Sequence, residues 1–418
     1  MQFDISDVFG RLKAVCVLLR TIMLWPVVMI LPCDKKKIVF GAWWGDQFGD
    51  NPRYFMDYII RQDAGYKCYW VGNECIRDLV DRHGDVTFVR KGSLLSVWHC
   101  ATAGWLCFSI SIGYDITTFP TFHRAKLLCF WHGTAFKGVT YRKTDLGVAR
   151  RTGALGRLRA LANSFMKYAY ARDAFASFSY PEMITEMPYE CPGVFLPSKS
   201  MAFGTPRIDY LIRNRCNNLE IQRVREKYSC LLNLPIEKKW FLYLPTWRKG
   251  LDVKFSFLSS QLGPEYQRIL SMRNAIIIEK QHPQVLEALR HDVKRNDVMV
   301  SVSQEMSRKI DMQELLLAAD RLITDYSSCF CDFATLDRPV IHYAYDYEWY
   351  VNVERGVEYD LQLVAAGPIV KSEDELLCYL EAPDEVLLAN RGCLSKKLVE
   401  SETGMASSRF AEWVGLLK

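Results

Sequence analysis

The chain has 418 residues, of which half are hydrophobic and 13% are aromatic. This composition is enough to fill the packed cores of two domains, and it excludes general disorder. The net charge of +5 is mild for this length, so charge alone does not indicate a nucleic-acid partner. Fourteen scattered cysteines without a Cys-x-x-Cys pair argue against zinc clusters and disulfide frameworks, and they indicate reduced thiols in a cytosolic compartment.

The N-terminal segment 15–33 is strongly apolar, although Arg20 and Pro26 interrupt it, and three lysines follow at 35–37. No small-residue cleavage site follows, which argues against a signal peptide, and the length is borderline for a membrane span. We predict a helix that lies in or dips into the cytoplasmic leaflet, with the lysines at the headgroups. The alternative is a packed helix of the first domain.

Short apolar runs alternate with helical stretches through the first half of the chain. The predicted strands are 38–40, 68–71, 87–89, 106–109, 125–130 and 174–178, the last strand of this half. A glycine-rich turn over 41–53 follows the first strand and leads into a helix over 54–60, with Pro52 near its start. This alternation predicts a parallel sheet with helices on both faces.

A histidine follows one of these strands directly, in the run Trp131-His132-Gly133-Thr134. The carboxyl end of a parallel strand lies at the edge where ligands bind, and an imidazole accepts a proton near neutral pH. Thr134 and Lys137 add polar groups. A core or capping histidine is the alternative.

The most basic part of the chain is 137–172, where apolar residues are interleaved with the cations. A basic amphipathic helix binds an anionic membrane or a polyanionic acceptor, or it is a solvated face of the fold. Nucleic acid is a further alternative, but no RNA or DNA motif accompanies the segment. A joining segment over 181–197, rich in proline and glutamate, separates it from a domain boundary near Gly204.

The second half repeats the pattern, with predicted strands at 240–244, 275–278, 298–300, 322–324 and 340–343. The turn 325–328 supplies capping residues for a helix that ends before Pro339, and three helices over 373–380, 386–399 and 407–417 close the chain. Four strand ends deliver polar side chains to one edge. In chain order these are Thr246 and Arg248, Lys280 and His282, Ser327 and Ser328, and Tyr343, Tyr345 and Asp346. Cations beside a helix N-terminus predict a site for two phosphates. Asp332, one turn into that helix, is predicted to accept ribose hydroxyls or to be a surface or capping residue.

Several motifs of the chain have a familiar order and spacing. They are Trp131-His132-Gly133-Thr134, Gly204-x-Pro206-Arg207-x-Asp209, Pro245-Thr246-Trp247-Arg248, His282-Pro283, and 322–328 with Asp332-Phe333. Together they resemble the CDP-glycerol glycerophosphotransferases, which make teichoic acids and related capsule polymers, over about residues 38–356. Two positions depart from the family pattern: Ala135 stands where proline is frequent, and Ile208 where asparagine is common. Neither change removes a proposed catalytic group, but both leave the donor open.

The resemblance implies an α/β fold of the GT-B-like class, with two Rossmann-like domains and the active site in the cleft between them. The expected organisation is a membrane-associated helix (1–34), an acceptor domain with basic membrane-facing helices (35–203), a nucleotide-donor domain (204–390) and C-terminal helices (391–418). The expected location is the cytoplasmic face of the bacterial cell membrane, peripheral or monotopic. No cofactor, metal or nucleic acid is expected, and a homo-oligomer stays open.

By matching positions, the resemblance makes His132 and His282 the two active-site histidines. The predicted substrate-binding residues are Gly133, Thr134, Lys137, Arg207, Asp209, Thr246, Arg248, Lys280, Ser327, Ser328 and Asp332. Of these, Arg248, Ser327 and Ser328 would hold the donor's diphosphate.

The predicted reaction moves a polyol phosphate, glycerol phosphate in the first place, from a CDP-polyol to a hydroxyl of a lipid-linked or polyanionic acceptor. His132 accepts the hydroxyl proton and CMP leaves. One alternative is a ribitol phosphate transferase, and another is a nucleotide-sugar glycosyltransferase of the same architecture. A third is a membrane-associated, polyanion-binding protein with an inactive site.

Overall fold

The computed structural model describes residues 23, 26–28, 30–117, 124–136, 174–190, 195–246, 248, 263–281, 295–354 and 357–417. The chain divides into two compact units. Unit 1 comprises Met1–His132, Tyr141–Ala202 and Ser407–Lys418, and unit 2 comprises Gly133–Thr140 and Phe203–Ala406. Most of the predicted N-terminal helix and the whole of the basic segment, Lys137 included, lie outside the described residues, as does His282. Among the described residues, no helix is both long enough and apolar enough to cross a membrane.

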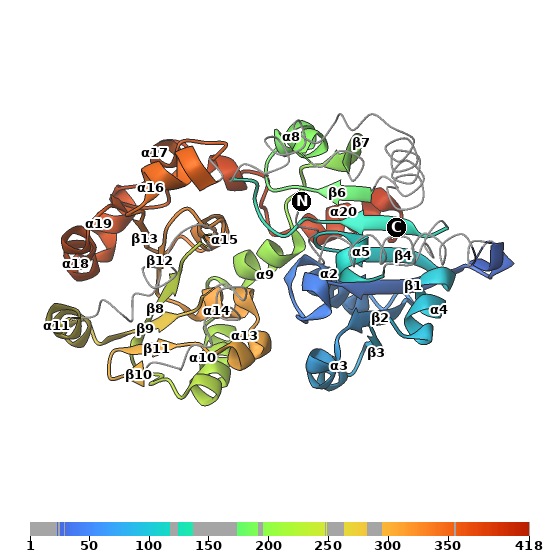
Figure 1. The fold of residues 1–418 in the computed structure, drawn as a ribbon, viewed down its shortest axis with the longest axis horizontal. Helices are drawn as coiled ribbons and strands as arrows, with labels where there is room; N and C mark the ends of the chain where they lie inside the picture. Colours follow the sequence, from blue (N-terminus) through green and yellow to red (C-terminus); the bar gives the residue numbers. More distant parts are fainter. Residues whose placement is uncertain are drawn as a thin grey trace, which may run out of the picture. The chain divides into compact units, whose positions relative to one another are not determined.

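Unit 1 is built on a seven-stranded sheet in the order β3-β2-β1-β4-β5-β6-β7, in which every pair is parallel (Figure 1). Its strands are β1 (Asp34–Gly41), β2 (Lys67–Gly72), β3 (Thr87–Arg90), β4 (Ala103–Phe108), β5 (Lys126–Cys129), β6 (Ala174–Ser177) and β7 (Phe195–Met201). The helices are η1 (Trp43–Gly45), α2 (Asp50–Arg61), η2 (Glu74–Ile76), α3 (Arg77–His83), α4 (Leu94–Thr102), α5 (Ile112–Asp115), α8 (Met183–Glu190) and α20 (Ala406–Val414).

Unit 2 has a second seven-stranded sheet, in the order β10-β11-β9-β8-β12-β13-β14, in which β10 alone is antiparallel to its neighbour. The strands are β8 (Lys239–Leu244), β9 (Ala275–Glu279), β10 (Arg295–Asn296), β11 (Met299–Ser301), β12 (Arg321–Thr324), β13 (Val340–Tyr343) and β14 (Ile369–Val370). The helices before β12 are α9 (Pro206–Asn214), α10 (Asn218–Leu232), α11 (Pro264–Met272), α13 (Gln304–Lys309) and α14 (Met312–Ala318). Those after it are α15 (Cys329–Ala334), α16 (Tyr347–Trp349), η6 (Tyr350–Glu354), α17 (Leu361–Val364), α18 (Glu373–Glu381), α19 (Asp384–Ala389) and η7 (Lys397–Val399).

The two sheets share one winding. In each, the first strand along the chain pairs on one side with the second and on the other with a strand reached by a crossover, so the order reverses between β1 and β4 and between β8 and β12. Open parallel sheets bind ligands beyond the carboxyl ends of their strands at such a reversal. The predicted α/β class with two parallel-sheet domains is therefore confirmed.

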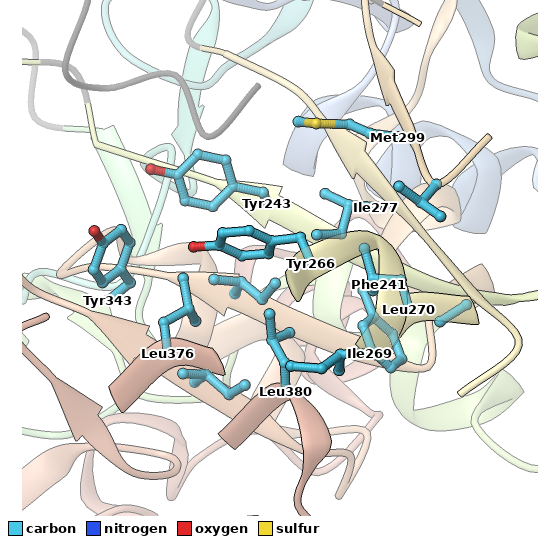
Figure 2. Close-up of a cluster of buried hydrophobic side chains, with 14 of the residues drawn as sticks. Phe241, Tyr243, Tyr266, Ile269, Leu270, Ile277, Met299, Tyr343, Leu376 and Leu380 are labelled. Atoms are coloured by element: carbon cyan, nitrogen blue, oxygen red, sulfur yellow. The ribbon is translucent and has the colours of Figure 1, made fainter. Parts of the chain in front are cut away.

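The core of unit 2 packs α11 and α18 against the sheet, as Figure 2 shows. Ile269 of α11 and Leu380 of α18 contribute to the aliphatic part of this cluster, together with Ile277 of β9. Tyr243 and Tyr343 lie near the carboxyl ends of β8 and β13. The aromatic end of the cluster is therefore at the carboxyl edge of the unit 2 sheet (Figure 2). Continuous apolar strands of this kind are typical of sheets covered on both faces.

Three predictions of local structure are wrong. The segment 181–197 is not a plain connection, because it contains α8 and the start of β7, and β6 is therefore not the last strand of unit 1. Pro197 hid this strand, yet β7 is at the sheet edge, where proline is tolerated. The helix predicted over 386–399 ends at Ala389, and the backbone after it bonds to the segment 363–365 instead: Gly392 N–H donates to the Ala365 carbonyl (2.9 Å) and Leu394 N–H to the Leu363 carbonyl (2.8 Å).

Candidate active site

The carboxyl edge of unit 2 gathers three of the predicted residues around Asp325, the residue that follows β12. The Asp325 carboxylate accepts hydrogen bonds from the backbone N–H of Thr246 (2.8 Å) and from its hydroxyl (2.6 Å). It also accepts from the backbone N–H of Ser327 (2.9 Å) and pairs with Arg248 Nη1 at 3.0 Å. Asp325 thus joins the ends of β8 and β12 at the point where the strand order reverses. From the sequence alone, Asp325 is predicted only as one of the capping residues of the following helix.

Arg248 is buried and its guanidinium is held by the protein itself. Nη2 donates to Asp346 (2.8 Å) and to the hydroxyl of Tyr326 (2.7 Å), and Nη1 donates to the carbonyl of Thr246 (2.6 Å). The rings of Tyr326 and Tyr345 both lie 5.2 Å from the guanidinium carbon. Burial disfavours the charged form, but Asp325 and the bond to Asp346 outweigh it, and the net pKa is above the ordinary arginine value. The side chain is therefore a fixed cation.

Lys280 is the opposite case. It follows β9 directly, its side chain is 7% exposed, and among the described residues no carboxylate pairs with its ammonium group. Burial lowers the pKa of Lys280 to about 8, opposed only by a charge interaction with Cys329, the first residue of α15. Buried charges are normally paired because desolvation is costly. An ammonium group that no carboxylate of the described residues pairs with, beside the turn at Ser327, has the chemistry to bind an anionic ligand.

The turn 325–328 is held differently from the prediction. Ser328 precedes α15, but its side chain makes no capping hydrogen bond. The turn is held instead by the hydrogen bond from Ser327 N–H to the Asp325 carboxylate. His342 of β13 supports the turn from behind: its Nδ1 donates to the Asp325 carbonyl (2.7 Å) and its Nε2 accepts from Ala366 N–H (3.1 Å). Burial lowers the pKa of His342 to about 4, which keeps the ring neutral. No local sequence pattern indicates this role of His342.

Arg207, Asp332 and Gly133 lie close together on the other side of this turn. Both oxygens of the buried Asp332 carboxylate are engaged, by Arg207 Nη2 (2.9 and 3.0 Å) and by Gln313 Nε2 (2.8 Å). A Cβ on Gly133 would lie 3.0 Å from the Ser328 hydroxyl and 3.7 Å from Arg207. The glycine of the His-Gly-Thr motif thus contacts the serine turn, and its neighbour Thr134 is buried and hydrogen-bonded to Cys331.

Asp209 and Gly204 shape the backbone that precedes and carries Arg207. Gly204 has a φ of +88°, a conformation that other residues adopt only with strain. The Asp209 carboxylate accepts from the backbone N–H of Ala406 at 2.8 Å, and Arg213 lies 3.6 Å from it. Ile208, one of the two departures from the family pattern, is fully buried. This motif holds α9 in place within unit 2.

In unit 1, His132 follows β5 at the carboxyl edge of the sheet. Its ring contacts Trp131 (centroids 4.4 Å apart) and meets Trp43 edge-on at 5.8 Å. Trp131 itself has a φ of +58°, and its carbonyl accepts a hydrogen bond from Asn51 Nδ2 at 3.0 Å. Strained non-glycine backbone of this kind concentrates at functional sites.

Two aspartates that we did not predict hold this edge together. Asp50 accepts hydrogen bonds from Trp43 Nε1 and from the Ser109 hydroxyl, both at 2.9 Å. Asp115 accepts from the backbone N–H of Trp44 (3.2 Å) and from three further N–H groups after β4. Burial raises the pKa of Asp115 to about 6, although these N–H groups oppose it. For Asp50, the run Gly49-Asp50-Asn51-Pro52 is a signal that can be read from the sequence.

The described residues contain no cluster of three or more histidine, cysteine or acidic side chains that would hold a metal ion. His282 and Lys137 belong to the predicted site but lie outside the part of the chain that the structure describes.

Two doubly wound, largely parallel sheets place this chain in the class of two-domain α/β proteins, in which ligands bind at the strand-order reversals. The fold matches that of the wall teichoic acid polymerase TagF, with a TM-score of 0.72 at 21% identity over 99% of this chain and 98% of that one. It also matches the fold of S. aureus MnaA solved with UDP, with a TM-score of 0.52 at 10% identity over 92% of this chain and 98% of that one.

The family model for CDP-glycerol:poly(glycerophosphate) glycerophosphotransferase matches residues 23–415, and the chain belongs to this family. A teichoic acid poly(glycerol phosphate) polymerase of Bacillus spizizenii is 28% identical over 96% of this chain and 100% of its own length. The polymerase of the same name from Bacillus subtilis is also 28% identical, but this chain spans only 49% of it. A teichoic acid glycerol-phosphate transferase of Staphylococcus aureus is 26% identical over 91% of this chain and 93% of its own length. The predicted family, and with it the prediction of a glycerophosphotransferase enzyme, are confirmed.

Proposed function

We propose that this chain transfers glycerol phosphate from CDP-glycerol to a hydroxyl at the end of a poly(glycerol phosphate) or lipid-linked acceptor, with release of CMP. In this proposal the two units are the halves of a GT-B-type enzyme: unit 1 takes the acceptor and unit 2 the nucleotide donor. The family model and the relatives named for glycerol phosphate support this donor. Relatives named for ribitol phosphate match this chain less well: one is 21% identical over 92% of it, and another is 26% identical over 80%.

The observation that carries the donor assignment is Lys280. A buried ammonium group that no described carboxylate neutralises gains a counter-charge when a diphosphate binds beside it. The Ser327–Ser328 turn lies near it, because Ser327 hydrogen-bonds Cys329 and Cys329 interacts with Lys280. Lys280 and the N–H and hydroxyl groups of this turn hold the diphosphate, with His282 as the further group that the family motif supplies.

Arg248 has a different role in this proposal from that of Lys280. Two carboxylates and a tyrosine already occupy its guanidinium, so it adds a fixed positive field and keeps the ends of β8, β12 and β13 in register. Arg207 and Asp332 act similarly, because their pairing fixes the backbone that faces Gly133. Preorganised charge of this kind supplies most of the catalysis in phosphoryl transfer.

His132 is the proposed base. The acceptor oxygen forms a bond to the phosphorus that carries the glycerol, and its proton passes to the imidazole. The bond from that phosphorus to the bridging oxygen breaks, and the electron pair leaves with CMP. The proposed place of the reaction is the cytoplasmic face of the cell membrane, with the chain bound peripherally.

The test is incubation of the full chain with CDP-glycerol and a glycerol phosphate oligomer, followed by measurement of CMP and of product mass. His132→Gln should lower kcat by about a hundredfold or more. His83→Gln is the control, because His83 ends α3 and pairs with Asp57 at 2.9 Å. A wild-type rate in His132→Gln would remove the base assignment. CMP release from CDP-ribitol alone would change the donor, and a product without added phosphorus would replace the reaction by glycoside formation.

A further inference from the structure

Two exposed aromatic side chains stand at the strand-order reversal of unit 1. Trp44, just after β1, is 41% exposed. Tyr114, in α5 after β4, is 57% exposed, and the two ring centroids are 6.1 Å apart. The reversal between β1 and β4 is the position at which an open parallel sheet binds its ligand. Single exposed aromatic side chains are common, but two adjacent exposed rings at this position indicate a binding surface.

The backbone beneath this pair is strained and firmly held. Trp43 and Trp44 have φ values of +46° and +57°, which cost on the order of 1–3 kcal/mol each in residues other than glycine. The Trp44 N–H donates to Asp115 at 3.2 Å, and Lys91 Nζ donates to the Trp44 carbonyl at 2.7 Å and also to the carbonyl of Tyr114. One lysine and one buried aspartate thus fix both aromatic residues in outward-facing positions.

The pair is also continuous with the proposed base. The ring of Trp43 lies 5.9 Å from that of Trp44 and 5.8 Å from that of His132. A single indole therefore separates the exposed pair from the histidine that would take the acceptor proton. A group bound on Trp44 and Tyr114 would be separated from the proposed base by the width of that one indole.

We propose that Trp44 and Tyr114 form the acceptor subsite and pack against the C–H face of the polyol or sugar that ends the acceptor. The negative faces of aromatic rings attract the weakly positive C–H groups of such molecules, whose hydroxyls stay in water. Lys91, fixed beneath the pair, favours an acceptor that carries phosphate. This inference rests on the proposed function, because it assigns the second substrate of that reaction.

Trp44→Gly separates binding from folding. Glycine adopts the local φ without strain, so the thermal midpoint should not fall, although the indole is gone. The acceptor KM should rise about tenfold, while the KM for CDP-glycerol stays at its wild-type value. Trp44→Phe should recover most of the loss, and Tyr114→Ala should raise the acceptor KM independently. Trp98→Ala, an exposed tryptophan of α4, is the matched control and should leave both constants unchanged.

Equilibrium dialysis with a labelled glycerol phosphate oligomer, without donor, measures the same subsite when no turnover occurs. If the wild type binds the oligomer but transfers nothing, the proposed reaction fails and the subsite stands. If Trp44→Gly and Tyr114→Ala bind it as tightly as the wild type, the subsite is wrong whatever the activity. If the two variants still bind the oligomer but no longer sediment with anionic phospholipid vesicles, as the wild type would, the pair is a membrane contact and the acceptor subsite is wrong.

Discussion

Asp325 accepts two hydrogen bonds from Thr246, one from its backbone N–H at 2.8 Å and one from its hydroxyl at 2.6 Å. Unit 1 has the same device, because Asp115 accepts from the backbone N–H of Trp44 at 3.2 Å. In both units a buried aspartate from beyond the crossover strand holds the loop that follows the first strand. Each pair thereby fixes the loop geometry at the strand-order reversal, where these sheets bind ligands.

Replacing Asp325 with asparagine should lower the free energy of unfolding by about 3 kcal/mol, because it removes one of two carboxylates from the buried Arg248. Thr246→Val is the matched control: it removes one hydroxyl bond and leaves the charges, so it should cost only about 1 kcal/mol. Urea unfolding of both variants measures the difference. Equal losses would mean that the charge on Asp325 does not hold this edge together.

Lys280→Met should stabilise the protein at pH 7 and weaken donor binding. Burial lowers the pKa of Lys280 from 10.5 to about 8, so at pH 7 the folded state carries a buried charge that the unfolded chain keeps in water. The penalty is roughly 3 kcal/mol at 1.36 kcal/mol per pKa unit, and methionine removes it. The thermal midpoint should rise, and the KM for CDP-glycerol should rise by about tenfold or more.

The pH dependence gives an independent check on Lys280. Below pH 8 both states hold the proton and the penalty is complete. Between pH 8 and 10.5 the folded state releases it first, so wild-type stability should rise with pH over that range. Lys280→Met should lack this rise. A variant less stable than the wild type at pH 7 would show that a carboxylate outside the described residues, or a bound anion, already neutralises the lysine.

Most of the fold was predictable because its strands are continuous apolar runs. The run 240–244 became β8 almost unchanged, as did 340–343 for β13. The failures have local causes: Pro197 disguised an edge strand, and β14 has only two residues. A two-residue strand carries no periodicity, so only its neighbour, β13, determines it.

The site was predictable in part, since strand order alone places residues at one edge. The predicted strand order placed Thr246, Arg248 and Ser327 at the same edge, and the structure places all three around Asp325. Partners were harder to predict, because pairing depends on which side chains meet in space. Strand order also places Asp346 at this edge, but nothing local identifies it as the hydrogen-bond partner of Arg248.

Arg207 and Asp332 should behave as a coupled pair. Each single change, Arg207→Met or Asp332→Leu, leaves a buried charge without its partner and should cost about 3 kcal/mol. The double variant should cost clearly less than the sum of the two, which urea unfolding of all four proteins measures. Additive losses would mean that the two residues act separately, and Asp332 would then be available for a ribose hydroxyl.

His342 should make the protein sensitive to mild acid. Burial lowers its pKa from 6.5 to about 4, and the neutral ring accepts from Ala366 N–H while donating to the Asp325 carbonyl. Above pH 6.5 neither state is protonated and the stability is complete. As the pH falls from 6.5 to 4 the unfolded chain binds the proton first, so roughly 3 kcal/mol should be lost across that window.

His342→Gln removes the titrating group, so its unfolding free energy should be lower at pH 7 but should fall less between pH 6.5 and 4. Urea unfolding at half-unit pH steps gives both slopes. Because the ring holds the Asp325 turn, the variant should also raise the KM for CDP-glycerol at pH 7. Parallel slopes for variant and wild type would assign the acid sensitivity to other groups, and an unchanged KM would show that the turn keeps its shape without the ring.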